Sequence, residues 1–472
     1  MGCSSDSKVV EQLVAEGNFW IDQRLGCNEL DFEQTDKLFE VFVEGIKEVR
    51  VSGIEFLLGR LFDAIGFNKI KDELFRKLVL SRLCYPVSKL KTTEYLRRYE
   101  GYETDEDKIY RYLDKLYKKQ KRIVQQISHK HTVAVLGGEI KVVFYDVTTV
   151  YFEIDREDEL RKTGYSKDGK HSCPQIVLGL LVGSGGYPLG YEIFKGNKFE
   201  GHTMLPVVNL FRRKHNIKKV VVIADAGLLS AQNIESLGQN KCEYILGAKL
   251  KNENAELKKQ ILGLNLENGQ SAVIKKDEYN NIVVSYSDSR AKKDAANRQK
   301  GIDRLQKQIK SGKLSKSQIN NKGYNKFLKM EGELNVTLDL SKVDEDKKWD
   351  GFKGYVTNTT LNKEEVIGQY KELWQIEKAF RTAKSEIKVR PVFHYLPRRI
   401  EAHICIAFVA YKIYKELERQ LYDKKSGLSP EKAIEIAKTI YSIKAIKPKS
   451  KEPFEKMLLL TTEQKKLFKL FQ

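Results

Sequence analysis

The chain has 472 residues, of which 41% are hydrophobic, enough for several globular cores at ~100–200 residues per domain. Lys and Arg total 84 against 64 Asp and Glu, so the formal net charge is +20 at pH 7, which predicts a polyanionic partner. No apolar run approaches the ~18–20 residues of a membrane span, which favours nucleic acid over a membrane surface, although a generally Lys-rich organism would produce the same charge.

The N-terminal part, residues 1–135, has apolar residues at helical spacing and few Gly or Pro residues, which predicts an all-α domain that binds DNA. Helices are expected over residues 33–49, 56–67 and 109–127. The last of these helices is densely basic, which is typical either of a helix that contacts DNA or of a solvated helix surface. Both interpretations stay open.

Residues 136–250 predict the first part of an α/β core, because Val-, Phe- and Tyr-rich segments favour strands. Strands are expected over residues 140–152, 175–183, 187–194, 218–225 and 242–250, and helices over residues 202–216 and 229–240. The resulting order is β-β-β-α-β-α-β. An antiparallel meander followed by alternating helices and strands indicates an RNase H-like fold.

Residues 251–358 interrupt this order and predict a mostly β insertion domain. A hairpin is expected over residues 273–290, a polar basic helix over 292–319, and strands over 333–340 and 354–358. The core resumes over residues 359–415 with a long helix at 364–387, followed by another at 398–425. Residues 416–472 predict a helical C-terminal region that serves dimerisation or DNA contact.

Two Asp residues stand where chemistry is expected in such a core. Asp146 interrupts the hydrophobic strand VVFYDV, where a carboxylate is costly unless it is paired or bound to a metal. The alternative is an exposed position on the strand. Asp225 closes VVVIAD, and the carboxyl ends of strands line the functional crevice of an open α/β sheet. A helix cap is the alternative for Asp225.

The third feature lies in QYKELWQIEKAFRTAK. Tyr370, Glu377 and Lys384 are seven residues apart, so on one continuous helix they return within ~20° of the same direction. Trp374 and Arg381 lie close by. A surface helix with Glu–Lys pairs is the alternative, but it does not account for these residue types on one face.

Two Asp from adjacent strands and one Glu from a packed helix form an all-oxygen set, which suits Mg²⁺. Two such ions ~3.5–4 Å apart can activate an attacking oxygen and stabilise the leaving oxygen of a phosphoryl transfer. Lys384 and Arg381 would hold phosphates, and Tyr370 and Trp374 could stack on bases. The sequence therefore predicts a site for two magnesium ions, for which Mn²⁺ can substitute.

Many separate segments, in order between about residues 75 and 415, resemble the DDE transposases of bacterial insertion sequences that carry a β-rich insertion between the second Asp and the Glu. The segments are SRLCYPVSKLKT, YDVTTVYFE, GYSKDGKHSCPQIVLGLLV, FKGNKFEGHT, IADAGLLSAQNIESL, YILGAKL, WDGFKGYVTN, the helix from Tyr370 to Lys384, and RPVFHYLPRRIEAHICIAF. By this resemblance Asp146, Asp225 and Glu377 are the catalytic and metal-binding triad.

The resemblance implies nicking at the ends of a mobile element, and then attack of the freed 3′-hydroxyl on target DNA. Its expected partners are double-stranded DNA, as terminal inverted repeats and as target, and a second copy of the chain. Six cysteines without a C-x-x-C pair indicate a reduced, cytoplasmic protein, which we expect at the nucleoid. The candidate DNA-binding residues are Tyr370, Trp374, Arg381, Lys384, Lys388, Arg390 and Arg399.

The chain departs from the family signature at one position. The signature is Tyr, two residues, Arg, three residues, Glu, six residues, Lys, and Leu373 stands where Arg is expected. Arg381 is the candidate to supply that charge. Two other functions fit the residues: an inactive or N-terminally truncated transposase that binds element ends, and an RNase H-like nuclease that cuts without rejoining.

Overall fold

The chain folds into two units, which are described separately. Unit 1 takes residues 1–60, 88–106 and 420–472, and unit 2 takes residues 61–87 and 107–419. The computed structural model describes residues 5–25, 32–154, 156–217, 219–228, 231–240, 242–311, 320, 323–331, 335–390, 392, 394–448 and 450–472.

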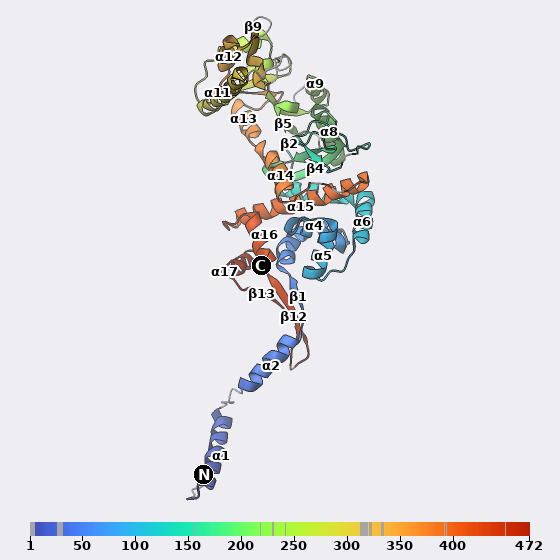
Figure 1. Cartoon of the computed structure of the whole chain (residues 1–472), viewed down its shortest axis with the longest axis vertical. Coiled ribbons are helices and arrows are strands. Elements are labelled where there is room, and N and C mark those ends of the chain that lie inside the picture. The colour runs from blue at the N-terminus through green and yellow to red at the C-terminus, as the bar shows by residue number, and fades with distance from the viewer. Residues whose placement is uncertain are drawn as a thin grey trace. The chain divides into compact units, whose positions relative to one another are not determined.

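Unit 2 is built on an eight-stranded sheet in the order β4-β3-β2-β5-β6-β11-β8-β7. Figure 1 labels β2, β4 and β5 of this sheet. β2 pairs antiparallel with β3 and parallel with β5, and β5 pairs parallel with β6. The predicted order of three antiparallel strands followed by alternating helices and strands is therefore present. The bounds are β2 Val142–Tyr151, β3 Gln175–Val182, β4 Pro188–Lys195, β5 Val221–Ala224, β6 Glu243–Ala248, β7 Ser271–Lys275, β8 Asn281–Tyr286 and β11 Phe352–Thr357.

The strands of the predicted insertion extend this sheet, which differs from the expectation of a separate domain. β11 pairs antiparallel with β6 on one side and with β8 on the other, so the backbone groups at the edge of β6 find partners. Beyond the sheet, β9 (Leu328–Glu331) and β10 (Asn335–Leu338) form a two-stranded ribbon. α11 (Asp288–Lys310) and α12 (Leu340–Lys347) pack with this ribbon through Leu305, Phe327, Leu328 and Val343. Residues 312–319 of the predicted basic helix lie outside the described residues.

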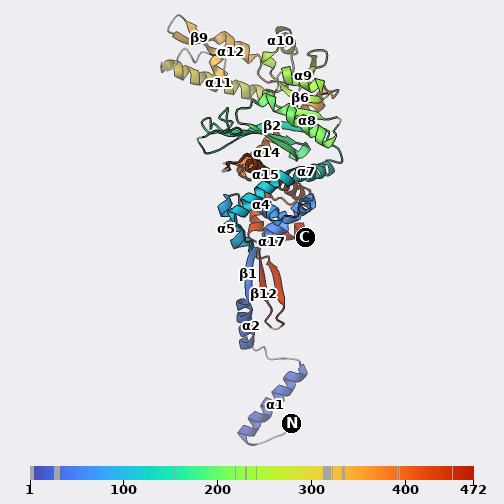
Figure 2. The same cartoon turned by 90° about the vertical axis from the view of Figure 1, so that its right-hand side faces the viewer.

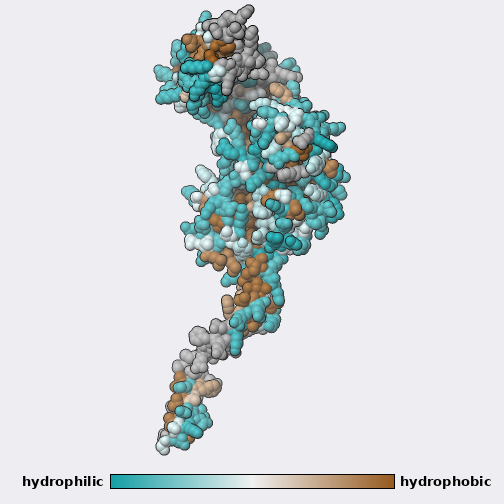
Figure 3. All heavy atoms as spheres, in the orientation of Figure 1, coloured by the Kyte–Doolittle hydropathy of each residue, from teal (hydrophilic) through white to brown (hydrophobic). Residues whose placement is uncertain are grey.

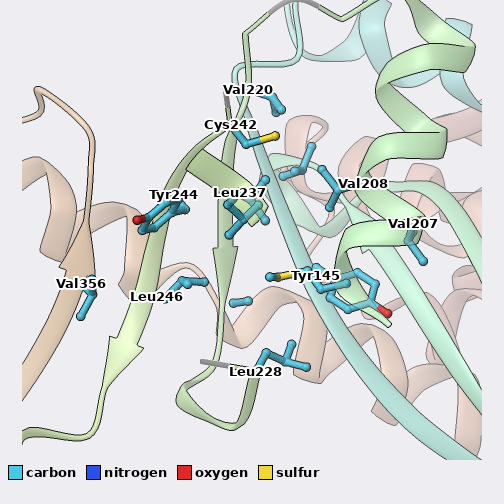
Figure 4. Packing of buried hydrophobic residues seen from close by; sticks show 14 of the residues in the cluster. Tyr145, Val207, Val208, Val220, Leu228, Leu237, Cys242, Tyr244, Leu246 and Val356 are labelled. Carbon is cyan, nitrogen blue, oxygen red and sulfur yellow. The ribbon is translucent and has the colours of Figure 1, made fainter. Parts of the chain in front are cut away.

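One face of the sheet is covered by α8 (Met204–His215) and α9 (Ala231–Gln239). Figure 4 shows Val207 and Val208 of α8 and Leu237 of α9 in the same buried cluster as Tyr145 of β2. Along β2, Val143, Tyr145 and Val147 belong to this core. Because strand side chains alternate between faces, Asp146 points to the opposite face.

That opposite face carries α13 (Lys363–Lys371), α14 (Trp374–Ser385) and α15 (Pro397–Asp423). Leu178 and Leu180 of β3 lie against Ala379 and Phe380 of α14. Leu180 is the cross-strand partner of Asp146, which confirms that Asp146 shares the face on which α14 packs. α13 packs farther along, on β5, β6 and β11.

The single helix predicted over residues 364–387 is wrong, because the chain kinks between α13 and α14. From residue 369 to 376 the backbone hydrogen bonds span three residues in place of the four of an α-helix. The Leu373 N–H donates to the Tyr370 C=O at 3.0 Å, and the Gln375 N–H donates to the Glu372 C=O at 2.9 Å. Such a tightened turn redirects a helix axis. Tyr370 therefore belongs to α13, whereas Glu377 and Lys384 belong to α14. The seven-residue spacing does not place all three on one helix face.

Further helices of unit 2 lie before the sheet and beside it. The helix expected over residues 109–127 is present as α6 and α7, which are joined by a π turn at Leu116–Gln120. α7 packs on β4. The bounds are α3 Arg60–Ile65, α4 Glu73–Cys84, α6 Glu106–Lys115, α7 Lys121–Val135 and α10 Ala255–Leu262.

Unit 1 combines helices with a three-stranded antiparallel sheet in the order β1-β12-β13. Figure 2 shows β1 and β12 of this sheet side by side. The predictions of an all-α N-terminal domain and a helical C-terminal region missed these strands. In β1, IKEVRV alternates apolar and polar residues, and Val49 pairs with Ile443 of β12. The bounds are α1 Ser7–Leu25, α2 Phe32–Glu44, β1 Ile46–Val51, α5 Lys89–Glu100, α16 Pro430–Lys438, β12 Tyr441–Ile446, β13 Pro453–Leu458 and α17 Thr462–Phe471.

The surface of the β1-β12-β13 sheet exposes apolar side chains, which Figure 3 shows in brown. Val49 is 52% exposed, and Tyr441 and Ile446 are each 37% exposed. In the part of the chain that the structure describes, no helix combines the length and the apolar composition needed to cross a membrane.

Candidate active site

Asp146 and Asp225 lie side by side at the centre of the large sheet. In the parallel pairing of β2 with β5, Tyr145 is the partner of Ala224, and the two Asp residues directly follow this pair. Both Tyr145 and Ala224 belong to the core under α8 and α9. The Asp that follows each of them therefore points to the face covered by α13 and α14.

The Asp146 carboxylate is largely buried, with 21% of its side chain exposed. Its Oδ1 accepts a hydrogen bond from the Val147 N–H at 2.7 Å and lies 3.6 Å from the Lys167 ammonium. Burial raises the pKa of Asp146 from 3.8 to about 6, and the charges of Glu200 and Asp225 add to the rise while Lys167 opposes it. The site therefore concentrates negative charge in a poorly solvated place.

Asp146→Asn is expected to raise the free energy of unfolding at about pH 7 by about 1–2 kcal/mol, a value discounted for partial exposure. Because the folded-state pKa of Asp146 lies above its unfolded value, this group's contribution to stability is present below pH ~4 and is lost as the pH rises through about 6. Urea unfolding in EDTA should therefore separate the two proteins near pH 7 and bring them together near pH 4. An equal gap at both pH values would contradict this origin.

Asp225 is oriented by Tyr370. The Tyr370 hydroxyl donates to Asp225 Oδ1 at 3.3 Å, and the Ala226 N–H donates to the same oxygen at 2.7 Å. Tyr370 is only 5% exposed and its ring packs edge-on against Tyr355. Burial raises the pKa of Tyr370, and Asp225 raises it further, so the hydroxyl stays protonated and remains a donor.

Glu377 stands in the first turn of α14 with an exposed side chain. Its charge raises the pKa of Tyr370, as that of Asp225 does. Both carboxylates also act on Lys353, whose ammonium lies 4.7 Å from the centre of the Tyr370 ring and whose pKa is lowered chiefly by burial. Tyr370 and Lys353 therefore stand in the field of both Asp225 and Glu377.

The residues fit a divalent cation in their chemistry. Asp146, Asp225 and Glu377 offer carboxylate oxygens, and burial together with the charges of Glu200 and Asp225 raises the pKa of Asp146 although Lys167 lies nearby. Within the described ranges, however, no group of three or more His, Cys, Asp and Glu side chains is gathered closely enough to hold a metal ion. Two carboxylates are adjacent on the sheet, and the third lies on the helix above it.

A cavity of about 410 Å³ opens beside Asp225. It combines cationic groups, which attract phosphates, with aromatic rings, which can stack on bases. Its cationic and aromatic lining consists of Lys249, Lys251, Arg290, Lys353, Trp349, Phe352 and Tyr370.

The predicted DNA-binding residues fall into three groups. Trp374, 49% exposed, lies with Arg381 and Lys388 on the surface. Lys384 and Arg390 contact Asp168, and Arg399 contacts Asp114. Tyr370 is buried at Asp225. The structure thus brings Lys384 and Arg390 together, and it separates Arg399 from them by pairing it with α6.

Four residues at the site were not singled out from the sequence: Lys167, Asp168, Glu200 and Lys353. The first three lie in the quoted segments GYSKDGKHSCPQIVLGLLV and FKGNKFEGHT, and Lys353 lies in WDGFKGYVTN. These segments carry the family resemblance, but a charged residue in a loop is usually solvated and does not by itself indicate a site. Nothing in the local spacing shows that these residues meet.

Comparison with known proteins gives two findings. Residues 137–413 match the family described as the transposase DDE domain. The solved structure of the piggyBac transposase synaptic complex with hairpin DNA is similar with a TM-score of 0.41 at 9% sequence identity, over 85% of this chain and 79% of that chain. No curated protein matches the chain.

Proposed function

The chain belongs to the transposase DDE domain family, and on that premise we propose that it cuts DNA at the ends of its own bacterial insertion sequence and joins the freed 3′-hydroxyl to target DNA. The family match confirms the resemblance at the level of a DDE transposase. The observation that carries the proposal is the position of Asp146 and Asp225, which directly follow the paired residues Tyr145 and Ala224 of adjacent parallel strands, on the face where α14 bears Glu377.

We propose Asp146, Asp225 and Glu377 as the catalytic residues and as the ligands of Mg²⁺ or Mn²⁺. When bound, two such ions supply charge that activates an attacking oxygen and stabilises a leaving one. Asp146 must be ionised to serve as a ligand, and its pKa of about 6 leaves it ionised at neutral pH. Tyr370 holds the Asp225 carboxylate in place by its hydrogen bond.

The other side chains of the site would bind the DNA strand. Lys384 and Arg390 offer cations, which are paired with Asp168, and the cavity at Asp225 offers cations and aromatic rings for a phosphate and its base. Trp374, Arg381 and Lys388 are exposed and available for DNA contact. We place this activity in the cytoplasm, at the nucleoid, and propose a homodimer that holds two DNA ends.

The test is a cleavage assay on DNA that carries the terminal repeats of the element encoding the chain, with Mg²⁺ or with EDTA. Nicking at the repeat boundary that requires Mg²⁺ would establish end cleavage. Binding to the repeats without any cutting would instead identify an end-binding protein. Cutting without regard to the repeats would identify an RNase H-like nuclease.

A further inference from the structure

A turn between β2 and β3 places two neighbouring residues of opposite charge on the site. The Lys167 ammonium lies 3.6 Å from Asp146 Oδ1 and 3.4 Å from Glu200 Oε1, and it donates to the Val147 C=O at 2.7 Å. It is therefore the positive charge that partly offsets the crowded carboxylates around Asp146.

The next residue, Asp168, contacts positively charged side chains. Lys384 Nζ donates to its two carboxylate oxygens at 3.2 and 3.3 Å, and the Arg390 guanidinium forms a second ion pair with it. The side chains of Asp168 and Lys384 are 17% and 16% exposed, so this pairing is largely withdrawn from water. Asp168 thus sits between two cations that are proposed to bind DNA phosphates.

The turn itself is held by its own polar groups. Ser166 Oγ accepts from the N–H groups of Asp168 and Lys170 at 3.3 and 3.2 Å, and the Ser166 N–H donates to His171 Nδ1 at 3.3 Å. A hydrogen bond at 3.1 Å from the Lys167 N–H to Thr149 Oγ1 ties the turn to β2. These bonds hold the backbones of Lys167 and Asp168 together in one turn, so the positions of the two side chains depend on the same hydrogen bonds.

The charges of this turn have the same signs as those of the two ligands that the site is proposed to bind. The Lys167 ammonium contacts Asp146, which is proposed to bind a divalent cation. The Asp168 carboxylate contacts Lys384, which is proposed to bind a phosphate. We propose that Lys167 and Asp168 form a latch that closes both subsites until a divalent cation and DNA displace them together. This inference rests on the proposed function, because it takes its two ligands from there.

Coupling between the two ligands follows from the latch. Lys167 and Asp168 are neighbours in the chain, so an ion that displaces Lys167 also loosens Asp168 and exposes Lys384 and Arg390. Each ligand then raises the affinity for the other by the same factor, as linkage requires. Without the latch, the two ligands would couple only through their direct attraction.

The experiment uses the full chain and two matched pairs of variants. Lys167→Gln is compared with Lys170→Gln, which makes the same charge change on the same turn at an exposed residue. Asp168→Asn is compared with Glu159→Gln, which also removes one negative charge at an exposed position before the turn. Mn²⁺ binding is measured by electron paramagnetic resonance, and binding of a fluorescent mixed-sequence duplex by anisotropy, with and without Mn²⁺.

Lys167→Gln should bind Mn²⁺ about three- to fivefold more tightly than Lys170→Gln without DNA, the range of a partly exposed ion pair. Asp168→Asn should bind the duplex more tightly than Glu159→Gln in EDTA. The gain in DNA affinity on adding Mn²⁺ should be smaller in both latch variants than in their controls.

Affinities that match within each pair would overturn the latch. Failure of the latch proposal can be distinguished from failure of the transposase proposal, because DNA cleavage is measured independently of the affinities. A chain that cuts element ends but shows unshifted affinities refutes the latch alone. A chain that shows the shifts but cuts no DNA supports the latch and refutes the proposed activity.

Discussion

Glu377→Gln is expected to reduce DNA cleavage by about 10³-fold or more, while the chain still folds and binds DNA. Gln keeps the size of the side chain but removes the charge, and a group that stabilises charge in the transition state is worth on that order. Glu377 is exposed in the first turn of α14, so its replacement leaves the packing of Ile376 and Phe380 intact. The measurement is the initial rate of nicking at the repeat boundary with saturating Mg²⁺.

Glu386→Gln is the matched control, since it makes the same change at the exposed residue that ends α14. Its nicking rate should equal that of the unmodified chain. If Glu377→Gln cut as fast as this control, Glu377 would not be a catalytic residue, and the site would have to be sought around Asp146, Asp225 and Glu200.

Arg298→Ala is expected to lower the free energy of unfolding of the region around α11 by about 2–3 kcal/mol. Arg298 is 7% exposed and donates two hydrogen bonds to Asp350, at 2.6 and 2.5 Å, with Asp346 3.6 Å away. Removing one partner of a buried ion pair leaves the other charge uncompensated, which costs ~3–5 kcal/mol at full burial. The value is lower here because the Asp350 side chain is 17% exposed.

Hydrogen exchange of the α11 amides reports this change, because it follows opening of one region of the chain. Arg304→Ala, at an exposed position of the same helix, should leave exchange close to that of the unmodified chain. Equal protection of α11 in the two variants would show that the Arg298 contacts do not hold this helix in place.

The central strands could be predicted because their burial is continuous. All eight residues of β3 are buried, and a continuous apolar run such as QIVLGLLV is typical of a strand covered on both faces. The Asp residues at 146 and 225 stand out against such strands. Their position side by side follows from strand order, which the β-β-β-α-β-α-β pattern predicts.

The strands of unit 1 could not be predicted in the same way, because their partners are far apart in the sequence. β1 pairs with β12, which lies almost 400 residues later, as the pairing of Val51 with Tyr441 illustrates. IKEVRV also follows a strongly helical segment, so the helix predicted over residues 33–49 includes its first residues. A short strand with charged residues gains its stability from its partners, which local patterns do not show.

The sequence singles out three carboxylates and several cations, and it does not single out Lys167 and Asp168. Asp146, Asp225 and Glu377 stand in recognisable sequence patterns. Lys167 and Asp168 are identified only by their contacts with Glu200 and Lys384, which are distant in the sequence. The kink at Leu373 was equally hidden, since an apolar residue in a helical pattern gives no sign of a change from four-residue to three-residue bonding. Helix periodicity predicts a face only while the helix is continuous.

The most direct test of the central claim is a strand-transfer assay with a pre-cut element end that already carries a free 3′-hydroxyl. The labelled duplex is mixed with the chain, Mn²⁺ and a supercoiled plasmid, and the plasmid is then examined under denaturing conditions. We predict covalent joining of the label to the plasmid, absent in EDTA and in Glu377→Gln. A chain that nicks element ends but never joins the label to the plasmid would contradict the account and would be a nuclease.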